Sequence, residues 1–533
     1  MCVNFKKREL SYLSTKAGEV LPGDLSTNEA RQCTVHGIRH HIGFARSSEV
    51  TQLAGLSGQE LFARARNARL IMSNEMPAEM TAETFPYCVH YPDVASEDMY
   101  RALVQRYPGM RYQVGRACAV AGYVDLYREL DLLPDVSIAE EARENRANAG
   151  AQAIFANIMA APMRYRVMDD YTRAVTDAPE ALARLNGETS VVGSPGDRAD
   201  LWGYYLESHC EFDITEDGSI GRDNPKLKES GDCTPILTAR EVELLHSPLP
   251  FDLPTIRKTT LTLYAAYNGD IDRWDRLRGR RTWPLKMEHV CLARGCQFNT
   301  PMAVWLAKSP HILDSLGIRH RDRGMIKRAI NARFLMDDSI HHLLDPSVVP
   351  DEELPYWIWY PDLPHPTVVE ELAKVRPVMR PQCVRACIAG NWQSLYDALM
   401  GLDSQAAWVE EGVMNEAKAS PNPYYVQDLQ HRVQGRGYPV PRIDDDAEDW
   451  KQFLPQKDGN HRRAEEDTQN LQYHLFDSWF QLDPYEGYDD PMWSGFWERL
   501  MLSTRGINRF LTASDAEKEE NRRSLEAYLR EHP

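Results

Sequence analysis

Three acidic residues toward the C-terminal end of the chain have the spacing of a catalytic or cation-binding motif. Asp444, Asp445 and Glu448 spell D-D-x-x-E. Three carboxylates this close together can hold a hard cation, and their repulsion can raise the pKa of one of them so that it acts as a general base. The other interpretation is a solvated loop, because acidic triplets arise easily in charged linkers.

The triplet resembles the acidic motif of the fungal arginine-containing cyclodipeptide synthases, which join arginine to a second amino acid taken from aminoacyl-tRNA. That resemblance implies an enzyme of fungal metabolism with catalysis at Asp444, Asp445 and Glu448 and with tRNA as a partner. It covers this one motif, and the chain holds no second element of that family. The motifs GxxxxGK[ST], GxGxxG after a strand, HExxH and GxSxG are also missing. The enzyme is therefore the alternative hypothesis.

A short basic run, Arg278, Arg280 and Arg281, is the candidate for binding a phosphate group or RNA. The other interpretation is a solvated loop at the end of a helix pair, where the helix C-terminus favours positive charge. The whole chain carries a formal net charge of −18, which opposes a broad phosphate-binding surface.

Cys33, His36, His40 and His41 offer zinc-ligand atoms at close spacing. A structural zinc site usually takes four ligands from paired motifs, and no partner CxxC pair is present. We therefore predict no metal site and no cofactor. The ten cysteines are scattered along the chain, which indicates reduced thiols in cores and not a disulfide framework.

An internal duplication is the main sequence evidence for the fold. Residues 86–130 align with residues 355–399 at a constant offset of 269 without a gap, and sixteen of the forty-five positions are identical. Repetition at this level indicates a modular architecture, because one supersecondary unit cannot bury its apolar face alone and packs on its neighbours.

The match continues on both sides of the gapless segment. Upstream, after a five-residue insertion, residues 67–72 correspond to residues 331–336. Downstream, with a shift of one, Glu140-Glu141 is expected to correspond to Glu410-Glu411. Each copy then spans about a hundred residues.

Both copies are predicted to consist of short helices. In the first copy Ser96 caps one helix, residues 110–121 and 124–132 form two more, and Gly122 supplies a left-handed turn between them. The second copy repeats this pattern, with the turn expected at Gly390-Asn391.

Residues 264–277 resemble the inner part of an ankyrin repeat. Ala265-Ala266 lets two antiparallel helices approach, Gly269 reverses the chain, and the apolar Trp274 and Leu277 face a neighbouring repeat. The usual threonine-proline-leucine-histidine start is absent. The resemblance implies an all-α, ankyrin-like helical-repeat (solenoid-type) architecture with an internal tandem duplication.

Residues 106–123 and 355–362 resemble segments of a group of filamentous-fungal proteins of unassigned function. The resemblance covers roughly residues 60–430. It implies a fungal origin and a helical fold, and it brings no activity.

Trp357 and Trp359 are the candidates for a binding role, because they replace Cys88 and His90 of the first copy. Large aromatic residues in loops commonly act as interface anchors. The other interpretation is that they pack into the neighbouring repeat. Our main hypothesis is a scaffold that binds another protein.

Length and composition agree with a modular globular protein. A chain of 533 residues is too long for one core, and its hydrophobic fraction is 43%. No run of 18 apolar residues exists, so we expect no membrane contact and a cytoplasmic location. The expected segments are an N-terminal arm (1–55), the first repeat copy (56–185), an irregular linker (186–254), helix pairs with the second copy (255–434), a charged linker (435–474) and an aromatic helical segment (475–533).

Overall fold

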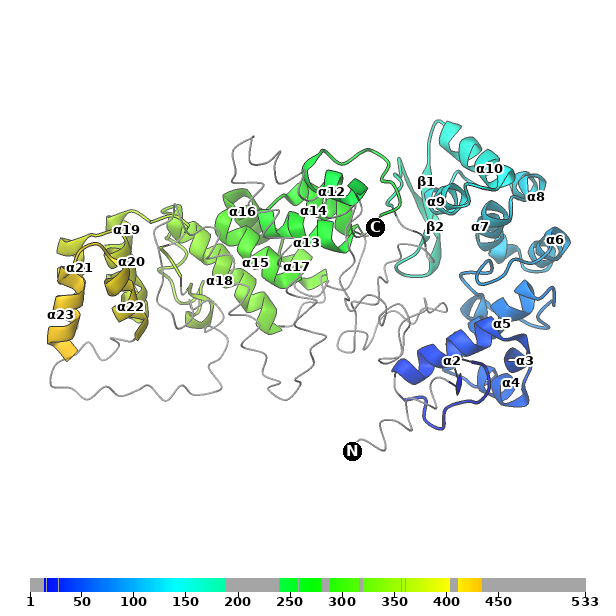
Figure 1. The fold of residues 1–533 in the computed structure, drawn as a ribbon, viewed down its shortest axis with the longest axis horizontal. Helices are drawn as coiled ribbons and strands as arrows, with labels where there is room; N and C mark the ends of the chain where they lie inside the picture. The colour runs from blue at the N-terminus through cyan, green and yellow to red at the C-terminus, as the bar shows by residue number, and fades with distance from the viewer. Residues whose placement is uncertain are drawn as a thin grey trace. The chain divides into compact units, whose positions relative to one another are not determined.

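Figure 1 shows the fold in a computed structural model of the chain. The described residues fold mainly into α-helices, as the sequence predicts, together with a two-stranded sheet. Within them, no helix combines the length and the apolar character needed to cross a membrane. The described residues are 14–15, 17–26, 28–187, 189, 239–256, 258–279, 288–315, 320–355, 357–359, 361–402 and 411–433.

The chain divides into two compact units, and each contains one copy of the duplication. The elements of the first unit are α2 (Asn28–His40), α3 (Ile42–Ala45), α4 (Ser48–Ala54), α5 (Glu60–Met72), η1 (Ala82–Thr84), α6 (Glu97–Arg106), η2 (Pro108–Met110), α7 (Arg111–Ala121), α8 (Val124–Glu129), α9 (Val136–Glu144), α10 (Ala149–Ala160), β1 (Tyr165–Asp169) and β2 (Ala174–Ala181). The elements of the second unit are α12 (Ala239–His246), α13 (Thr259–Asn268), α14 (Ile271–Arg278), α15 (Glu288–Phe298), α16 (Thr300–Lys308), α17 (Pro310–Ser315), α18 (His320–Met336), η4 (Asp351–Glu353), α19 (Pro366–Val375), η5 (Pro377–Met379), α20 (Arg380–Ala389), α21 (Gln393–Gly401), α22 (Glu411–Ala419) and α23 (Tyr424–Val433).

The two copies have the same order of elements. Helices α6, η2, α7 and α8 each begin 269 residues before α19, η5, α20 and α21. Ser96 caps α6, since its hydroxyl accepts a hydrogen bond from the Met99 amide at 3.3 Å, and Pro366 is the first residue of α19. The predicted helices are therefore present. The stacking of all helix pairs into an ankyrin-like solenoid stays a prediction.

Both copies also repeat one ion pair between a helix and the loop that follows it. Arg69 on α5 donates to Asp93 at 2.6 Å, and Arg333 on α18 donates to Asp362 at 2.7 Å. Each aspartate ends a Tyr-Pro-Asp sequence in the loop before α6 or α19. The pair therefore fixes this loop on the helix that precedes it in both copies.

Three helix pairs turn on a residue in the left-handed region, and an asparagine from further along the chain covers each turn. The Asn148 side chain, for example, donates to the Ala121 carbonyl at 2.8 Å while its oxygen caps α10. The turn residues and their asparagines are Gly122 (φ 79°) with Asn148, Gly269 (φ 70°) with Asn299, and Asn391 (φ 54°) with Asn422. In the second copy the left-handed residue is thus Asn391 and not Gly390.

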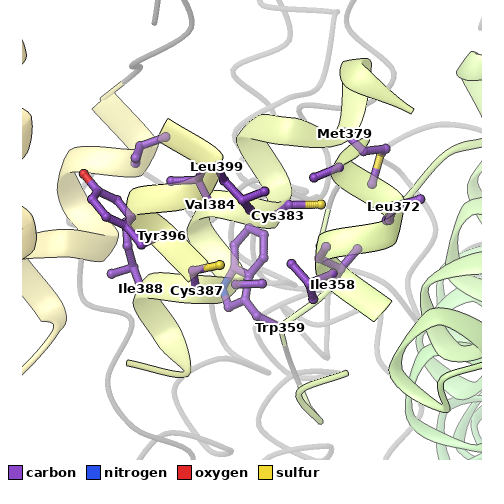
Figure 2. Packing of buried hydrophobic residues seen from close by; sticks show 14 of the residues in the cluster. Ile358, Trp359, Leu372, Met379, Cys383, Val384, Cys387, Ile388, Tyr396 and Leu399 are labelled. Atoms are coloured by element: carbon purple, nitrogen blue, oxygen red, sulfur yellow. The ribbon is translucent and has the colours of Figure 1, made fainter. Parts of the chain in front are cut away.

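Each copy builds its own hydrophobic core. Helix α7 and its counterpart α20 are buried over most of their length. Figure 2 shows Cys383, Cys387 and Trp359 packed among apolar side chains of the second core. Cys387 and its counterpart Cys118 are buried and free of disulfides, which confirms the prediction of core cysteines.

The structure differs from the sequence expectations in three segments. Residues 28–54 of the expected N-terminal arm are helical, and α2 to α4 share a small core with α5. Within the expected linker, residues 247–256 belong to the first unit, where the Leu253 amide donates to the Leu185 carbonyl at 3.1 Å. A hairpin of β1 and β2, paired antiparallel with a bulge after Arg166, was not predicted. Strand β2 is mostly exposed and contains a proline, so its sequence lacks a clear apolar alternation.

The downstream register predicted for the copies is wrong. Helices α9 and α10 begin 275 residues before α22 and α23, so Glu141 corresponds to Glu416. The change of offset falls between the start of α21 and the start of α22, outside the packed helices α20 and α22.

We expect Gly122→Ala to destabilise the first unit by about 1–3 kcal/mol, because an L-residue at this positive φ is strained and its Cβ would lie 2.2 Å from Asn148 Oδ1. Urea unfolding followed by circular dichroism measures the change. Gly43→Ala is the control, since no atom lies within 4 Å of a Cβ there. Equal stability of the Gly122→Ala variant and the wild type would contradict the role given to this turn.

Candidate functional site

Five ionisable side chains meet in the interior of the first unit, and we call them the first-copy cluster: Cys88, His90, Arg116, Glu141 and Asp170. All five are less than a tenth exposed. They come from the loop before α6, from α7, from α9 and from the turn between β1 and β2. The cluster therefore joins four segments of the fold.

Arg116 holds two carboxylates together in this cluster. Its Nη1 and Nη2 donate to the two Asp170 oxygens at 2.5 and 3.0 Å, and Nη2 also lies 3.1 Å from Glu141 Oε1. The Tyr87 hydroxyl donates to Asp170 at 2.7 Å. One guanidinium compensates one buried carboxylate, so the second requires another positive group.

His90 is placed to supply that second positive charge. Its Nε2 lies 3.5 Å from Glu141 Oε1. Cys88 Sγ lies 3.5 Å from His90 Nδ1 and 3.6 Å from Nε2, against the part of the ring that carries the charge of an imidazolium. A thiol, an imidazole and a carboxylate in this order are the parts of an activated cysteine: nucleophile, base and orienting group.

The pKa values of these groups follow from burial opposed by neighbouring charge. Burial raises the pKa of the Cys88 thiol, but the charge and hydrogen bond of His90, with Arg39, outweigh burial and leave that pKa below its usual value. Burial lowers the pKa of His90, but Cys88 and Glu141 raise it to about 9. Burial likewise opposes ionisation of Glu141 and Asp170, and Arg116 overcomes it, so the pKa of each carboxyl is lowered.

The second copy builds the same arrangement with a group that cannot titrate. Arg385 on α20 lies 3.3 Å from Glu416 on α22, as Arg116 on α7 lies near Glu141 on α9. Trp359, the counterpart of His90, donates its indole N–H to Glu416 at 2.8 Å, and Arg385 stacks on its ring at 4.3 Å. His90 and Trp359 thus occupy equivalent positions, and each lies beside the buried glutamate of its own copy.

The structure places the predicted binding residues Trp357 and Trp359 inside the second core, where both side chains are buried. Trp359 points into its own copy, where its indole N–H donates to Glu416. Neither tryptophan side chain is at the surface of the described structure.

Arg278 is buried as well, against the prediction of a phosphate- or RNA-binding run. Its Nε lies 3.5 Å from Glu288, which also accepts a hydrogen bond from the Trp274 indole at 2.9 Å. An arginine, a glutamate and an aromatic N–H therefore occur together a third time. Arg280 and Arg281 lie outside the described residues.

The other sequence candidates do not form a described site. Asp444, Asp445 and Glu448 lie outside the described residues. The His36 and His40 rings stack face to face with centroids 3.9 Å apart. In the described part of the chain, no group of three or more histidine, cysteine, aspartate or glutamate side chains is arranged to hold a metal ion.

A cavity of about 10 Å³ borders the first-copy cluster at Asp170. Glu140, Arg166 and Tyr171 also line it. A volume of this size holds about one water molecule. The space beside Asp170 therefore has room for a molecule of the size of water.

Comparison with known proteins gives one partial match. Residues 90–191 are similar to the family described as the YKP1 C-terminal domain, and this segment contains four residues of the cluster, His90, Arg116, Glu141 and Asp170. The match fits the resemblance to fungal proteins of unassigned function. No curated protein and no solved structure matches the chain.

Glu141→Gln should destabilise the first unit by about 3 kcal/mol or more, because it leaves Arg116 and His90 buried with one carboxylate fewer. Hydrogen exchange of α7 and α9 peptides, followed by mass spectrometry, measures the local change. Glu129→Gln is the matched control: Glu129 pairs with Arg101 at the surface, so its substitution should change little. Similar protection in both variants would rule out a stabilising role for the buried pair.

Acid should remove the stability that the Asp170 carboxylate provides. The pKa of Asp170 is lowered in the folded protein. Its contribution to the free energy of unfolding is therefore fully present above the pKa of an aspartate in the unfolded chain, about 3.9, and is lost as the pH falls through the pKa of Asp170 in the folded protein. The difference in unfolding free energy between the wild type and Asp170→Asn should therefore shrink below about pH 4. Urea unfolding at pH 7, 5, 4 and 3 measures it, and a constant difference would show that the pKa is not lowered.

Proposed function

We propose that this protein is an interaction scaffold whose two duplicated helical modules bind another protein. The supporting observation is an apolar residue exposed at the same position of both copies. Val94 is 36% exposed and Leu363, at an offset of 269, is 42% exposed. A water-exposed position that is apolar in both copies does not serve a shared core, so contact with a partner is the better explanation.

The position of these residues is fixed by the ion pairs described above. Val94 and Leu363 directly follow Asp93 and Asp362, which pair with the buried Arg69 and Arg333. A loop fixed in this way loses little conformational entropy when it binds. The two loops are therefore pre-ordered contact points.

A second exposed apolar position recurs after the helix pair. Leu133 is 41% exposed and Leu402 is 46% exposed, again at an offset of 269. Both copies thus carry an apolar residue before the repeated helices and one after them. The partner that suits these positions is a protein with apolar surface residues.

We expect Val94→Glu and Leu363→Glu each to weaken partner binding by about 1 kcal/mol or more, roughly fivefold in Kd, because a charge replaces an apolar contact. The variant with both changes should bind more weakly than either single variant. The wild type and the variants are first compared as baits in a fungal lysate. The captured protein is then identified and titrated to obtain Kd.

Leu56→Glu provides the control for this experiment, because Leu56 is 58% exposed in a turn that the duplication does not include. It should bind as the wild type does. Equal binding by the doubly substituted variant and the wild type would contradict the proposal, and so would an equal loss in Leu56→Glu.

A further inference from the structure

We propose that Cys88 is a thiolate nucleophile, paired with the His90 imidazolium, and that hydrogen peroxide oxidises it. The geometry is that of the first-copy cluster. Sγ of Cys88 lies 3.5 Å from His90 Nδ1, and His90 Nε2 lies 3.5 Å from Glu141 Oε1. An imidazolium between a thiolate and a carboxylate can donate a proton to each.

Charged and titratable groups from every surrounding element face this pair. Arg39 of α2 donates to the Cys88 carbonyl at 3.1 Å, and Tyr100 of α6 donates to the Val89 carbonyl at 2.6 Å. Arg116 of α7 and Glu141 of α9 complete the set. With Asp170 and the nearby Arg173, three guanidinium groups and two carboxylates lie around the cluster, so positive charge compensates a Cys88 thiolate.

Two buried cysteines of the cores differ from Cys88 in this respect. Cys118 and Cys387 occupy equivalent positions in the two cores, and burial raises the pKa of both thiols. Cys88 is replaced by Trp357 in the second copy, so a shared packing requirement does not explain it. Of the two equivalent positions, 88 and 357, only the first carries a thiol.

The oxidant must be small, because Cys88 has no exposed surface. Hydrogen peroxide is small and uncharged. Cys88 lies between η1 and α6 in a loop without helix or strand, and such segments open at lower free energy than packed helices. Access therefore requires a local opening and not global unfolding.

The step conserves atoms and electrons. The Cys88 thiolate attacks one peroxide oxygen, a sulfur–oxygen bond forms, and the oxygen–oxygen bond breaks. The leaving hydroxide takes a proton from the His90 imidazolium, so the products are a sulfenic acid, water and neutral His90. Sulfur loses two electrons and peroxide gains them, and an added thiol reduces the sulfenic acid back.

The test compares the pH dependence of oxidation at individual cysteines of the full-length native protein. Hydrogen peroxide is added at pH 6, 7 and 8, sulfenic acid is trapped with dimedone, and labelled peptides are quantified by mass spectrometry. Each cysteine is compared with itself at another pH, so differences in accessibility cancel.

For Cys88 we expect a rate that rises less steeply from pH 6 to 8 than that of an ordinary thiol, because the neighbouring imidazolium lowers the pKa of the Cys88 thiol. For Cys118, an ordinary thiol, the rate should rise about tenfold per pH unit. A Cys88 rate that rises as the Cys118 rate does would overturn the proposal. An unlabelled Cys88 in native protein would also overturn it, provided that the denatured protein is labelled.

His90→Gln tests the partner directly. It keeps a side-chain N–H donor for Glu141 but removes the imidazolium, so oxidation of Cys88 at pH 7 should slow and its rate should rise more steeply with pH than in the wild type. The wild-type profile decides the matter if this variant fails to fold. Unchanged oxidation in a folded His90→Gln variant would show that His90 does not activate the thiol.

Discussion

The need to neutralise a buried arginine governs the structure of both copies. Arg116 and Arg385 lie at equivalent positions of α7 and α20, which are buried over most of their length. A guanidinium buried there without a carboxylate would lower the free energy of unfolding by several kcal/mol. Each therefore fixes the position of a glutamate two helices later, Glu141 or Glu416. This pairing sets how α9 packs on α7 and how α22 packs on α20. It also explains why the offset between the copies changes outside these helices and not within them.

The glutamate in turn determines what the loop before α6 or α19 must provide. A buried carboxylate has more acceptor sites than one guanidinium fills, so a further N–H donor is needed. His90 provides it in the first copy and Trp359 in the second. The indole N–H is permanent, whereas the imidazole can lose its proton. The same structural requirement therefore has one solution that is chemically inert and one that is titratable, and the titratable one is accompanied by Cys88.

The sequence predicted the parts of this arrangement that depend on local spacing. The constant offset predicted the helices of the second copy once those of the first were assigned. Ser96 and Gly122 indicated a helix cap and a turn, and the structure contains both. An arginine kept identical within an apolar helix was the available signal for a buried ion pair. Its partners could not be read in advance, because Asp170 lies on a hairpin with little apolar alternation and Glu141 lies beyond the register change. Spacing alone could not decide the burial of Trp359 and Arg278, because single-sequence reasoning does not show that Glu416 and Glu288 lie beside them.

One loop connects the interior of each copy to its surface. Between Cys88 and Val94 the chain passes from the glutamate site, through Asp93 and its ion pair with Arg69, to an exposed apolar residue within seven residues. In the second copy the corresponding loop is anchored by two buried tryptophans. The side chains beneath its surface residue Leu363 therefore do not change their charge. In the first copy the support includes a thiol and an imidazole. Oxidation of Cys88 adds an oxygen atom to a side chain that has no exposed surface, and the surrounding core is close-packed. The loop must then shift, which makes Val94, and not Leu363, the contact point whose geometry depends on the state of the cluster.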